Sequence, residues 1–154
     1  MDLGTVMLIV ATFGTGVVTG LFVAFAVAVM PGLRATDDEV FLSAMQRINV
    51  AIVNPLFLLV FLGSPLLLVV ATIVGPRNAW LWAALALHLV GFAVTPAVNI
   101  PLNNALDAAT EPGPGRAAFE RPWNRAHAVR TLLMAASFAS CLVALEELSS
   151  GTTG

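Results

Sequence analysis

The chain has 154 residues, of which 58% are hydrophobic and only 10% are charged, and its formal net charge is −2. Soluble domains usually carry about 25% charged residues, so the polar surface here is too small to cover a globule in water. All seven basic residues are arginines, and they form no dense basic stretch of the kind that binds nucleic acid. The single cysteine, Cys141, excludes an intrachain disulfide. We therefore expect an integral membrane protein whose main partner is the lipid bilayer.

The first predicted membrane span covers roughly residues 4–30. Residues 3–33 contain no charged side chain, and this run exceeds the roughly 20 apolar residues that a membrane helix needs. Pro31 and Gly32 are expected to end the helix. The run is also too long for a secretory signal and lacks its basic start, so we interpret it as a permanent helix.

The second predicted span covers roughly residues 48–74. Residues 36–39 match a capping box, and apolar residues then recur at helical spacing, so the helix is expected to begin at the membrane surface before the span. Within the span, Asn54-Pro55 predicts a kink.

The third and fourth predicted spans cover roughly residues 79–99 and 126–147, with a polar, irregular loop at 100–122 between them. Pro101 cannot donate a backbone hydrogen bond, so the third helix is expected to break beside it. The fourth uncharged run, residues 131–145, is too short to span a bilayer by itself. A full span must extend backward and take polar side chains to or inside the membrane boundary.

The sequence therefore predicts one domain, residues 1–154, with an all-α fold: an integral membrane four-helix bundle. The numbers of arginines on the two sides predict that both termini face away from the cytoplasm, and we expect the plasma membrane as the location. One side has Arg77, and the other has Arg34, Arg47, Arg116, Arg121, Arg125 and Arg130. The oligomeric state stays open, a homo-oligomer included.

Polar residues gather where four helix ends share one membrane face. They are Arg47, Asn49, Asn54, Thr95, Asn99, Asn103, Asn104, Trp123, Asn124, His127 and Arg130. Trp123, His127 and Arg130 are spaced i, i+4 and i+7, so they share one side of a helix. Exposure of that side to lipid would be costly, which predicts a pocket in the bundle interior.

Each of these residues also has an ordinary interpretation. Membrane asparagines often only hydrogen-bond to neighbouring helices, Trp123 fits an interfacial belt, and Arg130 alone could extend to the headgroups. His88 lies near the middle of the third span, where a structural hydrogen bond is its ordinary role. A haem held by His88 and His127 is an alternative, although their depths differ. Other metal sites lack ligands, so the prediction is no cofactor, with haem as the minor alternative.

Four segments resemble motifs of the anthrone oxygenase-like family of small four-helix membrane proteins, and together they extend over nearly the whole chain. The segments are residues 25–31, residues 44–49 followed by Asn54-Pro55, residues 99–106, and Trp123 with residues 127–131. The resemblance implies the four-helix fold. It also implies oxidation of anthrones to anthraquinones by molecular oxygen, as in the characterised fungal members, without a metal or flavin.

The residues fit such chemistry as a cofactor-independent monooxygenase. The substrate must lose a proton to become an anion that reacts with oxygen, and His127 is the candidate base. Arg130, Asn99 and Asn103 are the candidate donors for the resulting oxyanion. The candidate substrate-binding residues are Arg47, Asn49, Asn54, Asn104 and Trp123, with Trp123 as a flat wall for a ring.

Two other functions stay open at this point. One is a non-catalytic binder or carrier of a small lipophilic or anionic molecule, which would need Arg130 but no base. The other is a haem-binding or structural subunit of a membrane complex. Oxygen consumption with an anthrone or hydroquinone separates the first alternative from the oxygenase, and an absorption spectrum identifies haem.

Overall fold

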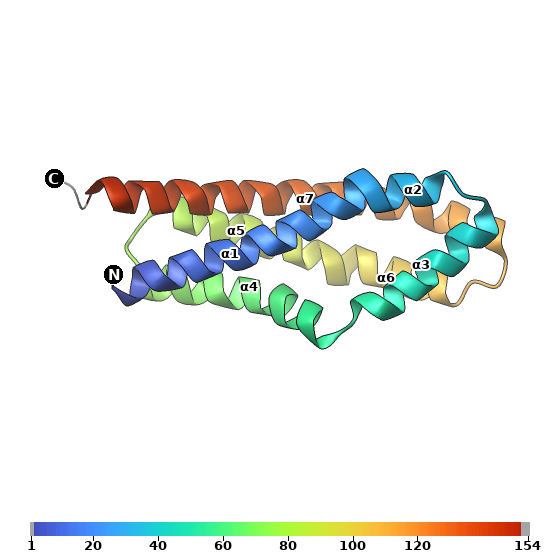
Figure 1. Ribbon diagram of the computed structural model, residues 1–154, viewed down its shortest axis with the longest axis horizontal. Helices are drawn as coiled ribbons and strands as arrows, with labels where there is room; N and C mark the ends of the chain where they lie inside the picture. Colours follow the sequence, from blue (N-terminus) through green and yellow to red (C-terminus); the bar gives the residue numbers. More distant parts are fainter. Residues whose placement is uncertain (1, 152–154) are drawn as a thin grey trace.

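The computed structural model describes residues 2–151, and every regular element within them is helical. Four rods lie side by side in an elongated bundle, with both chain ends at the same end (Figure 1). The stretches long and apolar enough to cross a membrane in this part of the chain are Leu3–Arg34, Pro55–Val74, Ala79–Asp107 and Pro112–Ser150. The predicted fold class, an all-α integral membrane four-helix bundle, is confirmed.

The first rod is longer than the predicted span of 4–30. It consists of α1 (Leu3–Ala24), the π-helix η1 (Phe25–Val29) and α2 (Met30–Arg34). In η1 the backbone pairing shifts, so that the N–H of Met30 donates to the carbonyl of Phe25, five residues earlier. Pro31 does not end the rod, because it lies in the first turn of α2, where a missing N–H costs little.

The second rod is interrupted where the sequence predicts only a kink. It consists of α3 (Asp38–Ile52) and α4 (Pro55–Val74). The side chain of Asn54 caps α4 by accepting from the N–H of Phe57 at 3.0 Å. The predicted span of 48–74 is therefore too long at its start. Asp37, and not Thr36, caps α3 by accepting from the N–H of Val40 at 2.8 Å.

The predicted irregular loop at 100–122 is wrong. The third rod consists of α5 (Ala79–Val94), the π-helix η2 (Thr95–Asn99) and α6 (Ile100–Asp107), and the fourth rod is α7 (Pro112–Gly151). Only residues 108–111 lie between them. Pro112 and Pro114 lie in the first turn of α7, which tolerates proline, and Pro101 follows the π-helix η2 within a continuous rod. Pro122 lies inside α7 without ending it. The predicted spans of 79–99 and 126–147 likewise end too early and begin too late.

The arginine-rich end of α7 extends beyond the thickness of a bilayer. The helix has 40 residues, which corresponds to about 60 Å, whereas the hydrocarbon core is about 30 Å thick. Its first turns carry Arg116, Glu120, Arg121 and Arg125. They pack with α3 and α6 into a small cap at the end opposite the chain termini (Figure 1).

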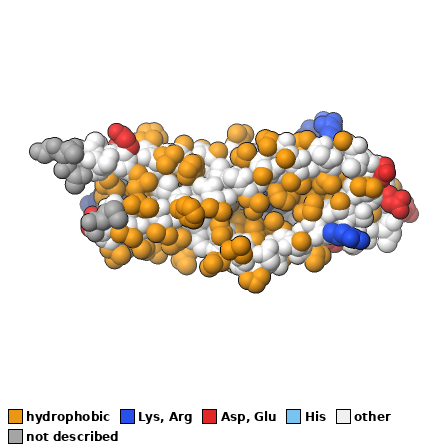
Figure 2. Space-filling view, in the orientation of Figure 1, with side chains coloured by type: hydrophobic (Ala, Val, Ile, Leu, Met, Phe, Trp, Pro, Cys, Tyr) orange, Lys and Arg blue, Asp and Glu red, His pale blue; other side chains and the backbone are white. Residues whose placement is uncertain are grey.

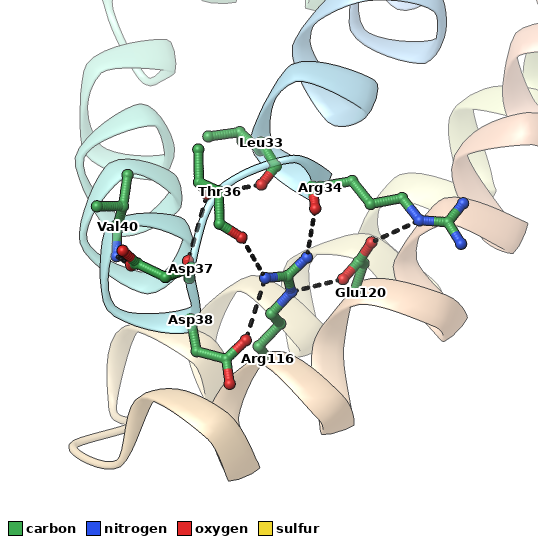
Figure 3. A network of polar contacts seen from close by, with 8 residues as sticks. All are labelled: Leu33, Arg34, Thr36, Asp37, Asp38, Val40, Arg116 and Glu120. Atoms are coloured by element: carbon green, nitrogen blue, oxygen red, sulfur yellow. Dashed lines mark hydrogen bonds and ion pairs between the residues drawn. The ribbon is translucent and has the colours of Figure 1, made fainter.

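Arg116 holds this cap together (Figure 3). Its guanidinium donates to the backbone carbonyls of Thr36 at 2.9 Å and Arg34 at 3.0 Å. It also pairs with Asp38 at 3.1 Å and Glu120 at 2.8 Å. One side chain of α7 thus fixes the turn between α2 and α3, which sets where α3 lies over the bundle.

The middle of the bundle has an apolar exterior, as expected for contact with lipid. Figure 2 shows hydrophobic side chains over the central part of one face, with charged side chains toward its ends. Inside the end that holds the termini, small and branched residues pack without exposure: Leu8, Ala11, Leu68, Ala71, Leu81, Ala84, Cys141 and Ala144. This end is solid, whereas the half next to the cap is not.

Candidate functional site

A cavity of about 410 Å³ lies in the half of the bundle next to the cap, and residues from all four rods line it. This volume lies within the range of small-molecule sites. Its polar lining residues are Asn49, Thr95, Asn99, Asn103, Trp123, His127 and Arg130, and most of the others are aliphatic or phenylalanine. Of the nine candidate site residues from the sequence, six meet here.

The face predicted on the fourth helix is present and points inward. Trp123, His127 and Arg130 are 3%, 2% and 8% exposed. The rings of Trp123 and His127 stack with centroids 4.7 Å apart and an interplanar angle of 18°. The Trp123 indole N–H donates to the side-chain oxygen of Asn103 at 2.8 Å, which ties α7 to α6.

Both ring nitrogens of His127 already have partners. Nε2 lies 2.9 Å from the backbone oxygen of Phe22. A carbonyl oxygen only accepts, so Nε2 carries the hydrogen. Nδ1 lies 3.0 Å from Nε of Arg130, whose N–H can only donate, so Nδ1 is the acceptor. The imidazole is therefore neutral, and the lone pair that a general base would use is engaged by Arg130.

Arg130 is a buried cation without a carboxylate. Besides His127, it donates from Nη1 to the hydroxyl of Thr95 at 2.9 Å. Its guanidinium carbon lies 4.3 Å from the ring centroid of Phe22 and 5.4 Å from that of Trp123. Within residues 2–151, Arg34 and Arg116 are the basic residues that form ion pairs with carboxylates, and Arg130 is not among them. The aromatic faces compensate this charge in part, but no anion neutralises it.

Asn99 is the second unsatisfied group of the cavity. Its side chain is 1% exposed, and neither its amide nitrogen nor its amide oxygen has a hydrogen-bond partner. It lies in η2 four residues after Thr95, so both side chains share one side of that helix. A buried amide without partners costs free energy. Asn99 thus offers a donor and an acceptor to whatever fills the cavity.

Asn49 and Asn103 line the cavity but are partly engaged by the protein. The amide of Asn49 donates to the carboxylate of Asp107 at 3.0 Å, which links α3 to α6. Asn103 accepts from Trp123, as described above. Both residues help to hold α3 and α6 around the cavity.

The prediction that Arg47, Asn54 and Asn104 line the same cavity is wrong. Arg47 is exposed on the outer side of α3, and Asn104 is exposed on α6. Both polar atoms of the Asn54 side chain are engaged by the backbone. Its oxygen caps α4, and its nitrogen donates to the backbone carbonyl of Ala51 at 3.0 Å. Adjacent helical positions differ by about 100°, so Asn104 cannot share the side of Asn103.

His88 lies outside the cavity lining. Its Nε2 lies 3.2 Å from the hydroxyl of Ser64, which gives the interhelical hydrogen bond expected as its ordinary role. Among residues 2–151 no group of three His, Cys, Asp or Glu side chains is placed to hold a metal ion. The absence of a cofactor, and the haem alternative, stay predictions.

Three residues of the site were not among the site residues predicted from the sequence: Phe22, Phe25 and Thr95. The ring centroids of Phe22 and Phe25 lie 5.5 and 6.2 Å from that of His127. Phenylalanines around a cavity have the same composition as core phenylalanines, so their type carries no signal. Thr95 belongs to the polar cluster predicted from the sequence, although it was not among the candidate catalytic or substrate-binding residues.

The mouth of the cavity faces the side of the bundle. Lining residues that are also exposed come from the interruption between α3 and α4, from α4, from η2 and from α6: Val53, Leu58, Leu62, Pro96 and Ile100. All five are apolar, and Val53 lies in the interruption of the second rod. The exposed rim of the cavity is therefore apolar.

Comparisons with known proteins agree with the resemblance in the motifs. A family model described as anthrone oxygenase matches residues 5–140. Neither a curated protein nor a solved structure matches the chain.

Proposed function

The chain belongs to the anthrone oxygenase family, and from that premise we propose that it catalyses oxidation by dioxygen of a flat lipophilic substrate with an ionisable oxygen. Anthrones and related phenolic or quinone-like molecules form this class. The substrate occupies the cavity, and the protein acts as a monooxygenase without a cofactor, because the substrate anion itself supplies the electrons.

The observation that carries the proposal is that Arg130 and Asn99, two buried polar groups with unused hydrogen-bonding capacity, line the same cavity. A buried guanidinium without a carboxylate favours an anionic ligand, since the ligand removes the cost of the unpaired charge. The free amide of Asn99 lies in the lining of the same cavity. Together they match an oxyanion with a neighbouring hydroxyl or carbonyl group.

The remaining walls suit an aromatic ring system. Phe57, Phe61 and Phe92 form a stacked series, with centroids 5.2 Å and 4.9 Å apart. Trp123 and Phe25 also line the cavity. Flat aromatic walls favour a flat ligand, and the volume of about 410 Å³ accommodates several fused rings with substituents.

The reaction balances with dioxygen alone. Anthrone, as its hydroxyl tautomer, loses the O–H proton and becomes an electron-rich anion. The anion reacts with dioxygen, a new C–O bond forms at the former methylene carbon, and the resulting peroxide anion takes up a proton from water to become a hydroperoxide. The hydroperoxide then loses its remaining C–H proton, the O–O bond breaks, and water leaves. Anthrone and dioxygen give anthraquinone and water, so the carbon is oxidised and the oxygen reduced. Arg130 and Asn99 stabilise the anion throughout.

The test is oxygen consumption by the purified protein in lipid nanodiscs with emodin anthrone. We expect one dioxygen consumed for each quinone formed, at a rate above spontaneous oxidation in empty nanodiscs. Asn99→Leu should lower kcat/KM by about 10²-fold, the cost of losing one oxyanion donor. The matched control is Asn104→Leu, which makes the same change at an exposed position of the same rod.

The two outcomes separate the candidate functions. A rate equal to that of empty nanodiscs, or equal losses in the two variants, would contradict the proposal. Tight binding of the anthrone without oxygen consumption would instead favour the binder or carrier. That second function has one observation in its favour, the engaged lone pair of His127.

A further inference from the structure

We infer that His127 serves this reaction as a positioning residue for Arg130 and not as its general base. The inference rests on the proposed function, because it assigns roles within the same site. It reverses the expectation from the sequence, in which histidine is the natural proton acceptor. Three features of the site carry it: the hydrogen bonds of the imidazole, the charges around it and the donors that Arg130 keeps free.

The first feature is that the imidazole is held as a bridge. Nε2–H donates to the Phe22 carbonyl, in the turn directly before the π-helix η1, and Nδ1 accepts from Arg130. π-Helical turns frequently occur at functional sites. Stacking on Trp123 fixes the plane of the ring. The bridge therefore sets the position of Nε of Arg130 relative to α1.

The second feature is the charge distribution around the pair. A proton on Nδ1 would replace the acceptor by a second donor, 3.0 Å from the Nε–H of Arg130. It would also place two cations side by side in a cavity whose lining contains no carboxylate.

The groups that face the pair from each neighbouring element do not offset this. In the cavity they are Phe22 and Phe25 from the first rod, Phe61 from α4, Thr95 and Asn99 from η2, Asn49 from α3 and Asn103 from α6. His127 also borders a second hollow, whose polar lining residues are Arg34 and Asn124, and neither of them is an anion. The one carboxylate nearby, Asp107, is bonded to Asn49. The Phe22 carbonyl would also accept from an imidazolium, but the cavity lining contains no carboxylate that would neutralise a second cation beside Arg130.

The third feature is what Arg130 keeps available. A guanidinium has five N–H donors. One donates to His127 and one to Thr95, and no protein acceptor is present for the others within the described part of the chain. With two donors anchored, the plane of the guanidinium is fixed and the remaining edge is free for an oxyanion. A preorganised donor of this kind costs no reorganisation when the anion forms.

The substrate proton then leaves without a protein base. The substrate gives its O–H proton to water and binds as the anion, because the anion is the form that Arg130 stabilises. Reaction with dioxygen and loss of water follow as described above. The balance of atoms is unchanged, since the proton given up on binding is recovered when the peroxide anion takes up a proton to become the hydroperoxide.

The experiment compares His127→Gln with His127→Leu. The glutamine oxygen can accept from Arg130 while its NH₂ donates to the Phe22 carbonyl, so it replaces the bridge but cannot act as a base near neutral pH. We expect His127→Gln to retain kcat/KM within about tenfold, and His127→Leu to lose about 10²-fold, the size of a lost electrostatic donor. His88→Gln, at a buried histidine outside the cavity, is the matched control and should keep the wild-type rate.

The pH profile separates the two roles. If His127 is a positioning residue, kcat/KM should rise with pH over the same range in the wild type and in His127→Gln, because that rise reports the ionisation of the substrate. A base would make this rise disappear in His127→Gln, and the glutamine and leucine variants would lose activity equally. Either result overturns the inference, and the glutamine variant decides the question even if the leucine variant does not fold.

A binding measurement without turnover keeps this test separate from that of the proposed function. Emodin, a hydroxyanthraquinone whose phenolate absorbs at longer wavelength than the phenol, reports its own ionisation when bound. We expect wild type and His127→Gln to lower the pKa of the bound dye by about one unit or more, as a neighbouring cation does, and His127→Leu to lose this shift. An equal shift in all three proteins overturns the inference, whether or not the protein consumes oxygen.

Discussion

The two halves of the bundle differ in how they use buried space. In the half that holds the termini, eight side chains without any exposure fill the interior, and Asn78 joins the start of α5 to Glu147 near the end of α7 at 2.9 Å. In the half next to the cap, the interior contains a cavity, a buried cation and an unpaired amide. The continuous helices of the first half also give way to π-turns and an interruption in the second.

The comparison teaches that close packing and the polar cavity lie at different ends of the same helices. Membrane helices associate through close packing because lipid provides no hydrophobic drive between them. The solid half supplies that packing, and it allows the other half to keep unsatisfied polar groups. Changes in the two halves should therefore separate stability from activity.

The largest expected effect is on activity and comes from Arg130→Gln. Removal of the charge should lower kcat/KM for an anthrone by about 10²–10³-fold, because the oxyanion loses its main partner. The free energy of unfolding should stay equal or rise, since a buried unpaired charge is costly. Oxygen consumption and reversible unfolding in mixed micelles measure the two quantities. A large loss of stability with unchanged activity would assign Arg130 to structure instead.

The next effect is on stability and not on activity, and it comes from Leu68→Ala in the solid half. Leu68 has no exposure, so the truncation leaves a void, and we expect a loss of about 2 kcal/mol in unfolding free energy. This is the low end of the range for buried leucine, because lipid rather than water solvates the side chain in the unfolded state. Emodin binding by the folded fraction should be unchanged. A weaker affinity of that fraction would show that the two halves are coupled.

A smaller loss of stability is expected from Arg116→Lys in the cap. Lysine keeps the charge but cannot form the planar fork that reaches two carbonyls and two carboxylates together. We expect a loss of about 1–2 kcal/mol in unfolding free energy, the value of one or two charge-assisted hydrogen bonds. Faster hydrogen exchange in the turn between α2 and α3 would locate the effect. Wild-type exchange there would contradict the role given to Arg116.

The smallest effect is expected from Arg47→Gln. The side chain lies on the outer face of α3, so kcat/KM should stay within about twofold of wild type. The assay is again oxygen consumption with emodin anthrone. A loss of kcat/KM comparable to that of Arg130→Gln would show that Arg47 belongs to the site and that the site extends beyond the cavity.

Much of the fold could be predicted because apolar length is a strong signal for membrane helices. The prolines were harder, since the same residue breaks a helix interior and starts a first turn. Pro112 occupies the first turn of α7, Pro101 follows a π-helix in a continuous rod, and Pro122 lies inside α7, so the expected loop at 100–122 is helical apart from residues 108–111. The π-turns have no comparable signature, so the added lengths of the first and third rods could not be foreseen.

The site could be predicted where one uninterrupted helix sets the geometry. Trp123, His127 and Arg130 share a face by spacing alone, as Asn99 and Asn103 do. Because the helix is interrupted between α3 and α4, helical spacing does not relate Asn54 to Asn49, and the direction of the Asn54 side chain could not be predicted from that of Asn49. The Phe22 carbonyl had no signal at all, because every residue has a backbone oxygen.

The apolar rim of the cavity has a consequence for the concentration to which the proposed enzyme would respond. If the proposed substrate enters past Val53, Leu62 and Ile100, it comes from the hydrocarbon phase, where a flat lipophile accumulates by partition. Half-saturation should then follow the mole ratio of substrate to lipid instead of the amount in the buffer. Diluting the substrate by adding empty vesicles at constant total volume should slow turnover, and a higher lipid content should raise the apparent KM in proportion.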